Sequence, residues 1–220
     1  MAALRLILAT LVCICAAACS RPDPGPPPTP TPAPIAPTIR EMPGRTIRVE
    51  GRGSGTSDPV LPDYTGGVPI GIDVVTLTHN GQSSFIVNAM QGSQSENVAT
   101  AIGPYQGQRP LVVMGAVSFE VTADGDWSLT IHPMSSGGQP TFTGIGDDVS
   151  SNFTPPAPGS WNVSHDGQTQ FLAKAHCLGG SITVEDATGA VQDTPTVQFP
   201  RGPCFWEVRA DGAWSLKPMT

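Results

Sequence analysis

Hydrophobic and polar positions alternate along much of the chain after residue 45, as they do in β-strands that bury one face. The strand-like segments predicted from this pattern are residues 46–50, 68–77, 85–89, 98–102, 111–116, 117–123 and 126–132. Gly, Pro, Asn, Asp and Ser separate these segments, as is typical of tight turns and loops. The pattern therefore predicts an all-β protein built from short strands.

The same pattern then returns in a second copy. His79-Asn80-Gly81-Gln82, with Phe85 after it, recurs as His165-Asp166-Gly167-Gln168 with Phe171. Ala123-Asp124-Gly125-Asp126-Trp127-Ser128-Leu129 recurs as Ala210-Asp211-Gly212-Ala213-Trp214-Ser215-Leu216. The histidines are 86 residues apart and the tryptophans 87. A repeat at one fixed period predicts two tandem modules.

The duplication sets the expected domain boundaries. Residues 45–134 form the first module, residues 135–140 a short link, and residues 141–220 the second module. Each module is long enough for one modest core. Paired strands with alternating faces predict two packed antiparallel sheets in each module. The expected fold is thus two tandem antiparallel β-sandwich modules, of the jelly-roll or immunoglobulin-like type.

Two histidines occupy the same place in both copies. His79 precedes Asn80-Gly81, and His165 precedes Asp166-Gly167. Such dipeptides predict two-residue hairpin turns, in which Gly81 and Gly167 take a positive φ. A polar side chain at the end of a strand then serves the fold, so both histidines are interpreted as structural.

Two tryptophans are also shared by the copies. Trp127 and Trp214 follow Asp-Gly sequences, which again predict turns. Their strand-like neighbours place both rings between the sheets. A large buried ring supplies much of the stability of a small module, so both tryptophans are expected in the core.

Residues 1–18 have the layout of a secretory signal peptide. Arg5 precedes an apolar run, and Ala16-Ala17-Ala18 ends the segment. Ala16-Ala17-Ala18-Cys19 resembles the lipobox of bacterial lipoproteins, with Ala16 where leucine is preferred. The resemblance implies that Cys19 becomes the first mature residue and is lipidated; the alternative is an ordinary signal peptide with an incidental cysteine. The protein is then expected outside the cytoplasm, anchored by its lipid to the cell membrane or outer membrane.

Residues 19–44 are rich in proline and are predicted to form a disordered linker after the lipidated cysteine. Proline fixes φ and removes a hydrogen-bond donor, which favours an extended polyproline II conformation. About 20 such residues reach roughly 60 Å, so the segment suits a tether. The alternative is a proline-rich ligand for a peptide-binding domain.

The composition narrows the classes of function. The chain has 25 Gly, 24 Pro, 13% charged residues and a formal net charge of -7. Nucleic acid is not expected as a partner, because phosphate neutralisation requires clustered Lys and Arg. The sequence contains no Gly-x-Ser-x-Gly or His-Glu-x-x-His motif. An enzyme, a cofactor and a metal centre are therefore not predicted.

Cys177 and Cys204 are the only cysteines beyond residue 19. Cys177 has the strand parity of Phe171 and Cys204 that of Trp206, so both thiols should point inward. A disulfide is predicted because the chain is expected to be exported. The alternative is a zinc site in which His165 or His176 joins the two thiolates.

Calcium binding is a second alternative for the loops. Four acids stand after the glycine-rich corners of the two modules: Asp58, Asp63, Asp147 and Asp148. Carboxylate oxygens are ligands that calcium prefers, but the EF-hand spacing is absent.

Three aromatic residues are candidates for ligand binding. Phe205 alternates out of phase with the inward Trp206, and Tyr105 and Trp161 are placed in loops. Exposed aromatic side chains suit a sugar or protein partner. The modules resemble β-sandwich modules that are repeated in exported bacterial proteins of unassigned function. The expected function is binding of an extracellular polymer or protein, such as a glycan or envelope protein; alternatives are a non-binding spacer, an accessory subunit of an envelope complex, or a hydrolase.

Overall fold

The computed structural model describes residues 33–42, 45–61 and 71–219. Within these ranges every regular element is a β-strand, and no helix is long and apolar enough to cross a membrane. Residues from Ala33 onward form one compact unit that contains both modules. The predicted signal peptide, Cys19 and most of the linker lie outside the described residues.

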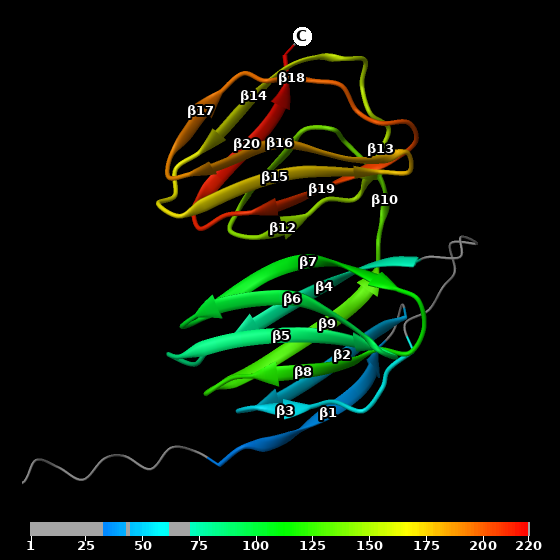
Figure 1. The fold of residues 1–220 in the computed structure, drawn as a ribbon, viewed down its shortest axis with the longest axis vertical. Helices are drawn as coiled ribbons and strands as arrows, with labels where there is room; N and C mark the ends of the chain where they lie inside the picture. The colour runs from blue at the N-terminus through cyan, green and yellow to red at the C-terminus, as the bar shows by residue number, and fades with distance from the viewer. Residues whose placement is uncertain (1–32, 43–44, 62–70, 220) are drawn as a thin grey trace, which may run out of the picture. The chain divides into compact units, whose positions relative to one another are not determined.

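The described residues of the first module form nine strands (Figure 1). They are β1 (Ile35–Met42), β2 (Thr46–Arg52), β3 (Gly55–Thr56), β4 (Gly71–His79), β5 (Ser84–Gln91), β6 (Gln94–Ile102), β7 (Tyr105–Val113), β8 (Ser118–Thr122) and β9 (Asp126–Pro133). One sheet has the order β1-β2-β9-β4-β7, and the other has the order β3-β8-β5-β6. Their strands pair antiparallel throughout.

The described residues of the second module form eleven strands, of which several have only two to four residues. They are β10 (Ser136–Gly138), β11 (Phe142–Ile145), β12 (Asp148–Val149), β13 (Asn152–Phe153), β14 (Gly159–His165), β15 (Gln170–Cys177), β16 (Gly180–Thr188), β17 (Val191–Asp193), β18 (Thr196–Val197), β19 (Cys204–Arg209) and β20 (Ala213–Pro218). Its sheets have the orders β11-β20-β14-β17 and β10-β13-β19-β15-β16; β18 also pairs with β14, and β12 with β19.

The pairing of strands is nested in both modules. In the first, β2 pairs with β9, β3 with β8, β4 with β7 and β5 with β6. In the second, the equivalent pairs are β11 with β20, β12 with β19, β14 with β17 and β15 with β16. A chain folded back on itself in this way and rolled into two facing sheets is a jelly roll. The predicted tandem β-sandwich fold is confirmed, and its topology is that of the jelly roll.

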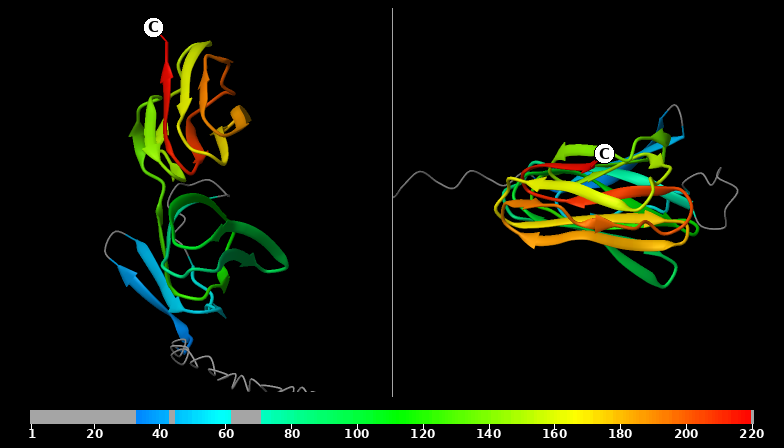
Figure 2. Two further views of the ribbon diagram at one scale, coloured as in Figure 1. Left: turned by 90° about the vertical axis from the view of Figure 1, so that its left-hand side faces the viewer. Right: turned by 90° about the horizontal axis from the view of Figure 1, so that it is seen from above.

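Each module has its own hydrophobic core between its two sheets, which Figure 2 shows as layers. Alternation along the strands fills the cores: Val49, Leu77 and Leu129 face inward in the first module and are 0% exposed. Trp127 and Trp214 are each 3% exposed and lie in the cores of their own modules, as the alternation predicts.

Strand β1 is a departure from the predicted boundaries, because residues 35–42 were assigned to the linker. The sequence places these residues in the linker because Pro34 and Pro37 continue the proline-rich composition of the preceding segment. Residues 38–42 contain no proline and pair in register with β2, whereas the register shifts between Ile35 and Thr38, around Pro37. Proline is tolerated on an edge strand because one row of its backbone groups faces solvent.

The predicted link between the modules is also partly regular. Ser136–Gly138 forms β10, which pairs parallel with β13 of the second module. Two hydroxyls add to this contact, because Ser135 and Ser151 are hydrogen-bonded at 2.6 Å. The second module therefore begins before residue 141.

The turns expected at Asn80-Gly81 and Asp124-Gly125, and at their copies Asp166-Gly167 and Asp211-Gly212, are not hairpins, because in each case the flanking strands belong to different sheets. The segment after His79 joins β4 to β5, and the segment around Gly125 joins β8 to β9; in both cases the two strands belong to different sheets. Neither Gly81 nor Gly125 is among the described glycines with positive φ. The dipeptides therefore mark crossings from sheet to sheet, and long-range nesting prevails over the local hairpin preference.

Candidate binding groove on the first module

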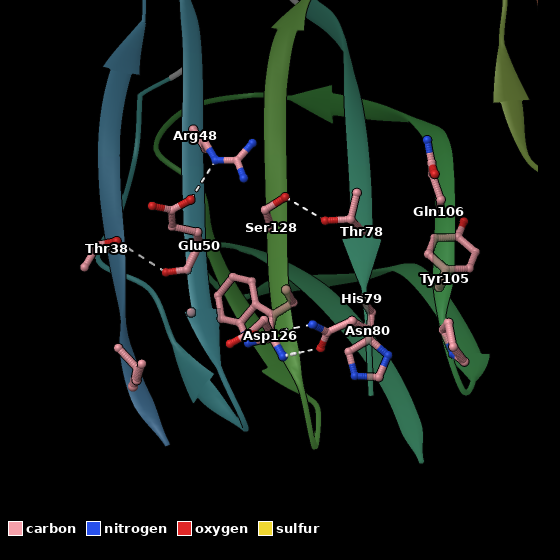
Figure 3. A pocket seen from close by; sticks show the side chains of 14 residues that line it. Thr38, Arg48, Glu50, Thr78, His79, Asn80, Tyr105, Gln106, Asp126 and Ser128 are labelled. Atoms are coloured by element: carbon pink, nitrogen blue, oxygen red, sulfur yellow. Dashed lines mark hydrogen bonds and ion pairs between the residues drawn. The ribbon is translucent and has the colours of Figure 1, made fainter. Parts of the chain in front are cut away.

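A groove of about 710 Å³ lies on the outer face of the first module (Figure 3). It crosses all five strands of the sheet β1-β2-β9-β4-β7. Its lining consists of Ile35, Thr38, Arg48, Glu50, Gly51, Thr78, His79, Asn80, Pro104, Tyr105, Gln106, Asp126, Trp127 and Ser128. The volume falls in the range typical of small-molecule sites.

One row of polar side chains runs across the groove. In sheet register, Thr38 pairs with Glu50, Glu50 with Ser128, Ser128 with Thr78, and Thr78 with Gln106. These positions share the outer face because side chains alternate along each strand, with Val49, Leu77 and Leu129 facing the core. We call these five residues the polar row.

Hydrogen bonds order the middle of the polar row. The hydroxyls of Thr78 and Ser128 are 2.8 Å apart, and Arg48 Nε donates to Glu50 Oε2 at 2.7 Å (Figure 3). The hydrogen bond from Arg48 lowers the pKa of Glu50, and the charges of Arg48 and Arg40 add to this effect. Glu50 is therefore a fixed anion and acceptor at neutral pH.

A second set of polar side chains lies two residues further along the same face. Arg52 donates from Nε to Asp126 Oδ1 at 2.5 Å and from Nη2 to Asp126 Oδ2 at 3.2 Å. Asn80 contacts the same residue: its Nδ2 donates to Asp126 Oδ2 at 3.3 Å, and its Oδ1 accepts from the Asp126 N–H at 2.8 Å. The hydrogen bond from Arg52 lowers the pKa of Asp126, as does the one from Asn80.

Trp127 lines the groove beside Gly51. The indole Nε1 donates to the Gly53 carbonyl oxygen at 2.8 Å, which closes the corner after β2 over the ring. Gly51 is required there, because a Cβ at this position would lie 2.7 Å from Trp127 Cζ2. The second module repeats the arrangement with Trp214, Gly146 and Gly144.

His79 fixes the turns at this end of the module. Its ring stacks on Phe85 with centroids 4.6 Å apart, and its Nδ1 donates to the Gly103 carbonyl oxygen at 2.9 Å. Its Nε2 lies 3.3 Å from Asp124 Oδ1. Asp124 Oδ2 in turn accepts from the N–H groups of Gln82 and Ser83, each at 3.0 Å, and these bonds lower the pKa of Asp124.

His165 makes the same set of contacts in the second module. It stacks on Phe171, its Nδ1 lies 2.9 Å from the Gly189 carbonyl oxygen, and its Nε2 lies 3.3 Å from Asp211 Oδ1. Both imidazoles have side chains that are 0% exposed. The shared histidines thus connect three turns of each jelly roll, which agrees with their structural interpretation.

Several residues that line the groove have no counterpart of the same type in the second module. Register places Val191 at the position of Tyr105 and Ala213 at that of Asp126. Among the described residues, the corresponding sheet of the second module ends at β11, whereas β1 extends the sheet of the first. Strand β1 supplies Thr38 and Ile35 to the groove.

Comparison with protein-family models and with curated proteins finds no match for this chain.

Two of the three aromatic candidates are not exposed. Trp161 is 1% exposed because it lies in β14, not in a loop, and packs on Trp206. Phe205 is 4% exposed; it does face away from Trp206, but it packs against Val74 of β4 and Val149 of β12. The alternation predicts that Phe205 faces away from Trp206, but it does not predict the contact of Phe205 with the first module.

Tyr105 is the one aromatic candidate that lines the groove. It is half-buried at the start of β7, and its hydroxyl donates to Asp147 Oδ2 at 2.6 Å. Burial raises the pKa of Tyr105. Its phenol is thus already engaged with the second module, and its ring forms part of the groove wall.

A buried network of charges joins the two modules, and sequence reasoning missed it. Arg109 Nη2 lies 3.0 Å from Asp147 Oδ2, and its Nη1 lies 3.8 Å from Glu207 Oε1. His176 Nε2 lies 2.8 Å from Glu207 Oε2, and Arg209 donates to Glu207 Oε1 at 2.9 Å. Burial alone would raise the pKa of Glu207, but the hydrogen bond from His176 and the charge of Arg209 outweigh it, and the pKa falls to about 2.

The predicted disulfide between Cys177 and Cys204 is confirmed. It joins the facing ends of β15 and β19 in the second module. The zinc alternative is wrong, because both thiols are consumed in the disulfide and His176 and His165 pair with carboxylates.

Asp58, Asp147 and Asp148, the described acids of the calcium alternative, do not form a common cluster. Within the described residues no group of three or more His, Cys, Asp or Glu side chains is placed to hold a metal ion. Asp147 instead accepts hydrogen bonds from Tyr105 and from the Ala210 N–H. Asp63 lies outside the described residues.

The polar row itself was not predicted. Each of its members is an unremarkable polar residue at an outward position of a strand, and only the nested pairing brings them together. The available signal was the alternation, which identified the outward positions but not the strand order.

Proposed function

We propose that this protein is an exported lipoprotein, anchored to the cell membrane or outer membrane through Cys19, that binds an extracellular polymer or protein in the groove of its first module. The groove carries the proposal. It crosses five strands of one sheet, has a volume typical of ligand sites, and presents polar side chains that are already hydrogen-bonded to one another.

The groove favours binding over catalysis. Its carboxylates, Glu50 and Asp126, each pair with an arginine, and both have lowered pKa values. A general acid needs a pKa raised toward neutrality, so neither carboxylate suits that role. Both are suited to accept hydrogen bonds at fixed positions.

The anchor rests on the lipobox-like sequence before Cys19 and on the proline-rich segment after it. We expect mass spectrometry of the mature protein to find an acylated Cys19 at the N-terminus. Replacement Cys19→Ser should release the protein from membranes, while Cys15→Ser should not. An unmodified Cys19, or cleavage elsewhere, contradicts the anchor.

Binding in the groove is tested by photo-crosslinking in cells that produce the full chain. A benzophenone amino acid replaces Gln106, which is exposed on the groove wall, or Gln192, which occupies the same register position in the second module. We expect covalent adducts with envelope material from position 106 and not from position 192.

Absence of adducts at position 106 contradicts binding in the groove. If adducts then form only at positions elsewhere, with one stable protein partner, the protein is an accessory subunit of an envelope complex. If no position forms adducts, it is a spacer.

A further inference from the structure

Resting on the proposed function, we infer that the ligand of the groove is a neutral, hydroxyl-rich polysaccharide that crosses the strands along the polar row. The inference rests on the charge of the groove, the hydrogen-bonding capacity of its side chains and its position on the face of a sheet.

The charges in the groove are internally paired. Glu50 pairs with Arg48 and lies 3.7 Å from exposed Arg40, and Asp126 pairs with Arg52, so each arginine near the groove has a carboxylate partner. The whole chain carries a formal charge of -7, which repels polyanions at long range. An acidic polymer is therefore disfavoured, and a neutral one is not.

The polar row has hydrogen-bonding capacity to spare. The Thr78–Ser128 contact uses one donor and one acceptor position; Ser128 is buried, so the capacity that a ligand can reach is that of the exposed Thr78 hydroxyl. The exposed amide of Gln106 adds both donors and an acceptor, and Glu50 adds acceptors. Sugar hydroxyls both donate and accept, which matches this mixed set.

The location of the groove disfavours a peptide. An extended peptide gains most by adding a strand at a sheet edge, where backbone groups are unpaired. The groove instead crosses the face of the sheet, where the inner strands β2, β9 and β4 are paired on both sides and offer only their side chains.

The length of the polar row suits a chain of several sugar rings. Strands in a sheet are about 4.8 Å apart, so five strands carry side chains across roughly 19 Å. The row ends at Thr38 on β1 and at Gln106 on β7. A polymer can continue past the β1 end, which is an edge of the sheet, whereas at the other end the second module adjoins β7, where the Gln108 N–H donates to the Asp147 carbonyl oxygen at 3.0 Å.

The test uses the full mature chain and the neutral polysaccharide fraction of the producing organism's envelope, separated from acidic polymers by anion exchange. Calorimetry should show binding that added salt leaves unchanged, as expected for a neutral ligand. Gln106→Ala and Thr78→Val should each weaken it about fivefold, which corresponds to one lost hydrogen bond.

Matched controls separate a local effect from misfolding. Gln192→Ala changes the equivalent glutamine of the second module, and Thr76→Val changes the preceding outward residue of β4, which does not line the groove. Both should retain wild-type affinity, and all variants should retain the wild-type melting temperature.

Two outcomes overturn the inference. One is no binding of the neutral fraction while the acidic fraction binds in a salt-dependent manner. The other is an adduct at position 106 that proteinase K digests and periodate leaves intact, which identifies a protein ligand. In both cases the groove still binds an envelope component, so the proposed function survives. Absence of any adduct at position 106 removes the proposed function itself.

Discussion

At the scale of single residues, Gly81 shows why the repeated motif contains glycine. Its backbone does not have a positive φ, so conformational freedom is not the reason. A Cβ at this position would contact the Asp124 carboxylate and lie 2.5 Å from His79 Nε2. Gly167 has the same relation to Asp211 and His165. Glycine is needed because the His–Asp contact fills the space of a side chain.

Replacement Gly81→Ala should therefore destabilise the first module by about 1 to 3 kcal/mol, the usual cost of overpacking. Urea denaturation of the full chain measures the effect. Gly115→Ala is the control, because no heavy atom lies within 4 Å of its added Cβ. Equal stability of the two variants would show that His79 and Asp124 can shift to make room for the added methyl group at little cost in free energy.

At the scale of elements, the sequence predicted the strands better than their partners. Alternation identified the buried faces around Val49, Leu77 and Leu129, and the duplication identified two modules. Nested pairing joins strands as distant as β2 and β9, and no local signal encodes it. The Asn80-Gly81 dipeptide favours a hairpin locally, yet its flanking strands enter different sheets.

Strand β1 and the groove were missed for related reasons. The prolines at 34 and 37 make residues 33–42 resemble the segment before them. The strand has no buried face to produce alternation, since most of its residues are exposed. Without β1 in its place, Thr38 has no apparent relation to Glu50, and the polar row cannot be assembled from the sequence.

The disulfide gives a prediction for β15 and β19. Its half-cystines are 27 positions apart, and closing a loop of that length stabilises by about 3.5 kcal/mol in the chain-entropy model. The double replacement Cys177→Ser/Cys204→Ser should lose this amount in urea denaturation. A reductant should destabilise the wild type equally and leave the double variant unchanged; an effect of reductant on that variant would exclude the disulfide as its cause.

At the scale of the whole molecule, the two modules are joined by a mixed apolar and charged contact. Phe205 packs with Val74, and Glu207 holds Arg209, His176 and Arg109 around it. Glu120 of the first copy occupies the position equivalent to Glu207 and is exposed. Duplicated positions thus acquired different roles according to whether the neighbouring module covers them.

The pKa of Glu207 gives a prediction for acid stability. It is lowered from 4.5 to about 2 in the folded protein, so the ionised side chain stabilises the fold above about pH 4.5, and this contribution is lost as the pH falls toward 2. Glu207→Gln should cost about 3 kcal/mol at neutral pH, because it leaves buried Arg109 short of a counter-charge, and should flatten the acid limb of the stability curve.

Thermal unfolding between pH 2 and pH 7 measures both effects. Glu120→Gln is the matched control and should change stability by less than about 0.5 kcal/mol. A variant at position 207 with the wild-type pH dependence would show that Glu207 does not carry the acid response.

The position of β1 has a mechanical consequence. The strand follows directly after the proline-rich segment, and it is held to β2 by backbone pairing along its length while most of its side chains remain exposed. If Cys19 is fixed to a membrane and the groove holds a polymer, a force between the polymer and the anchor passes through β1. A force along β1 would break its backbone pairing with β2 and so remove Ile35 and Thr38 from the groove. High tension would then release the ligand while both jelly rolls stay folded.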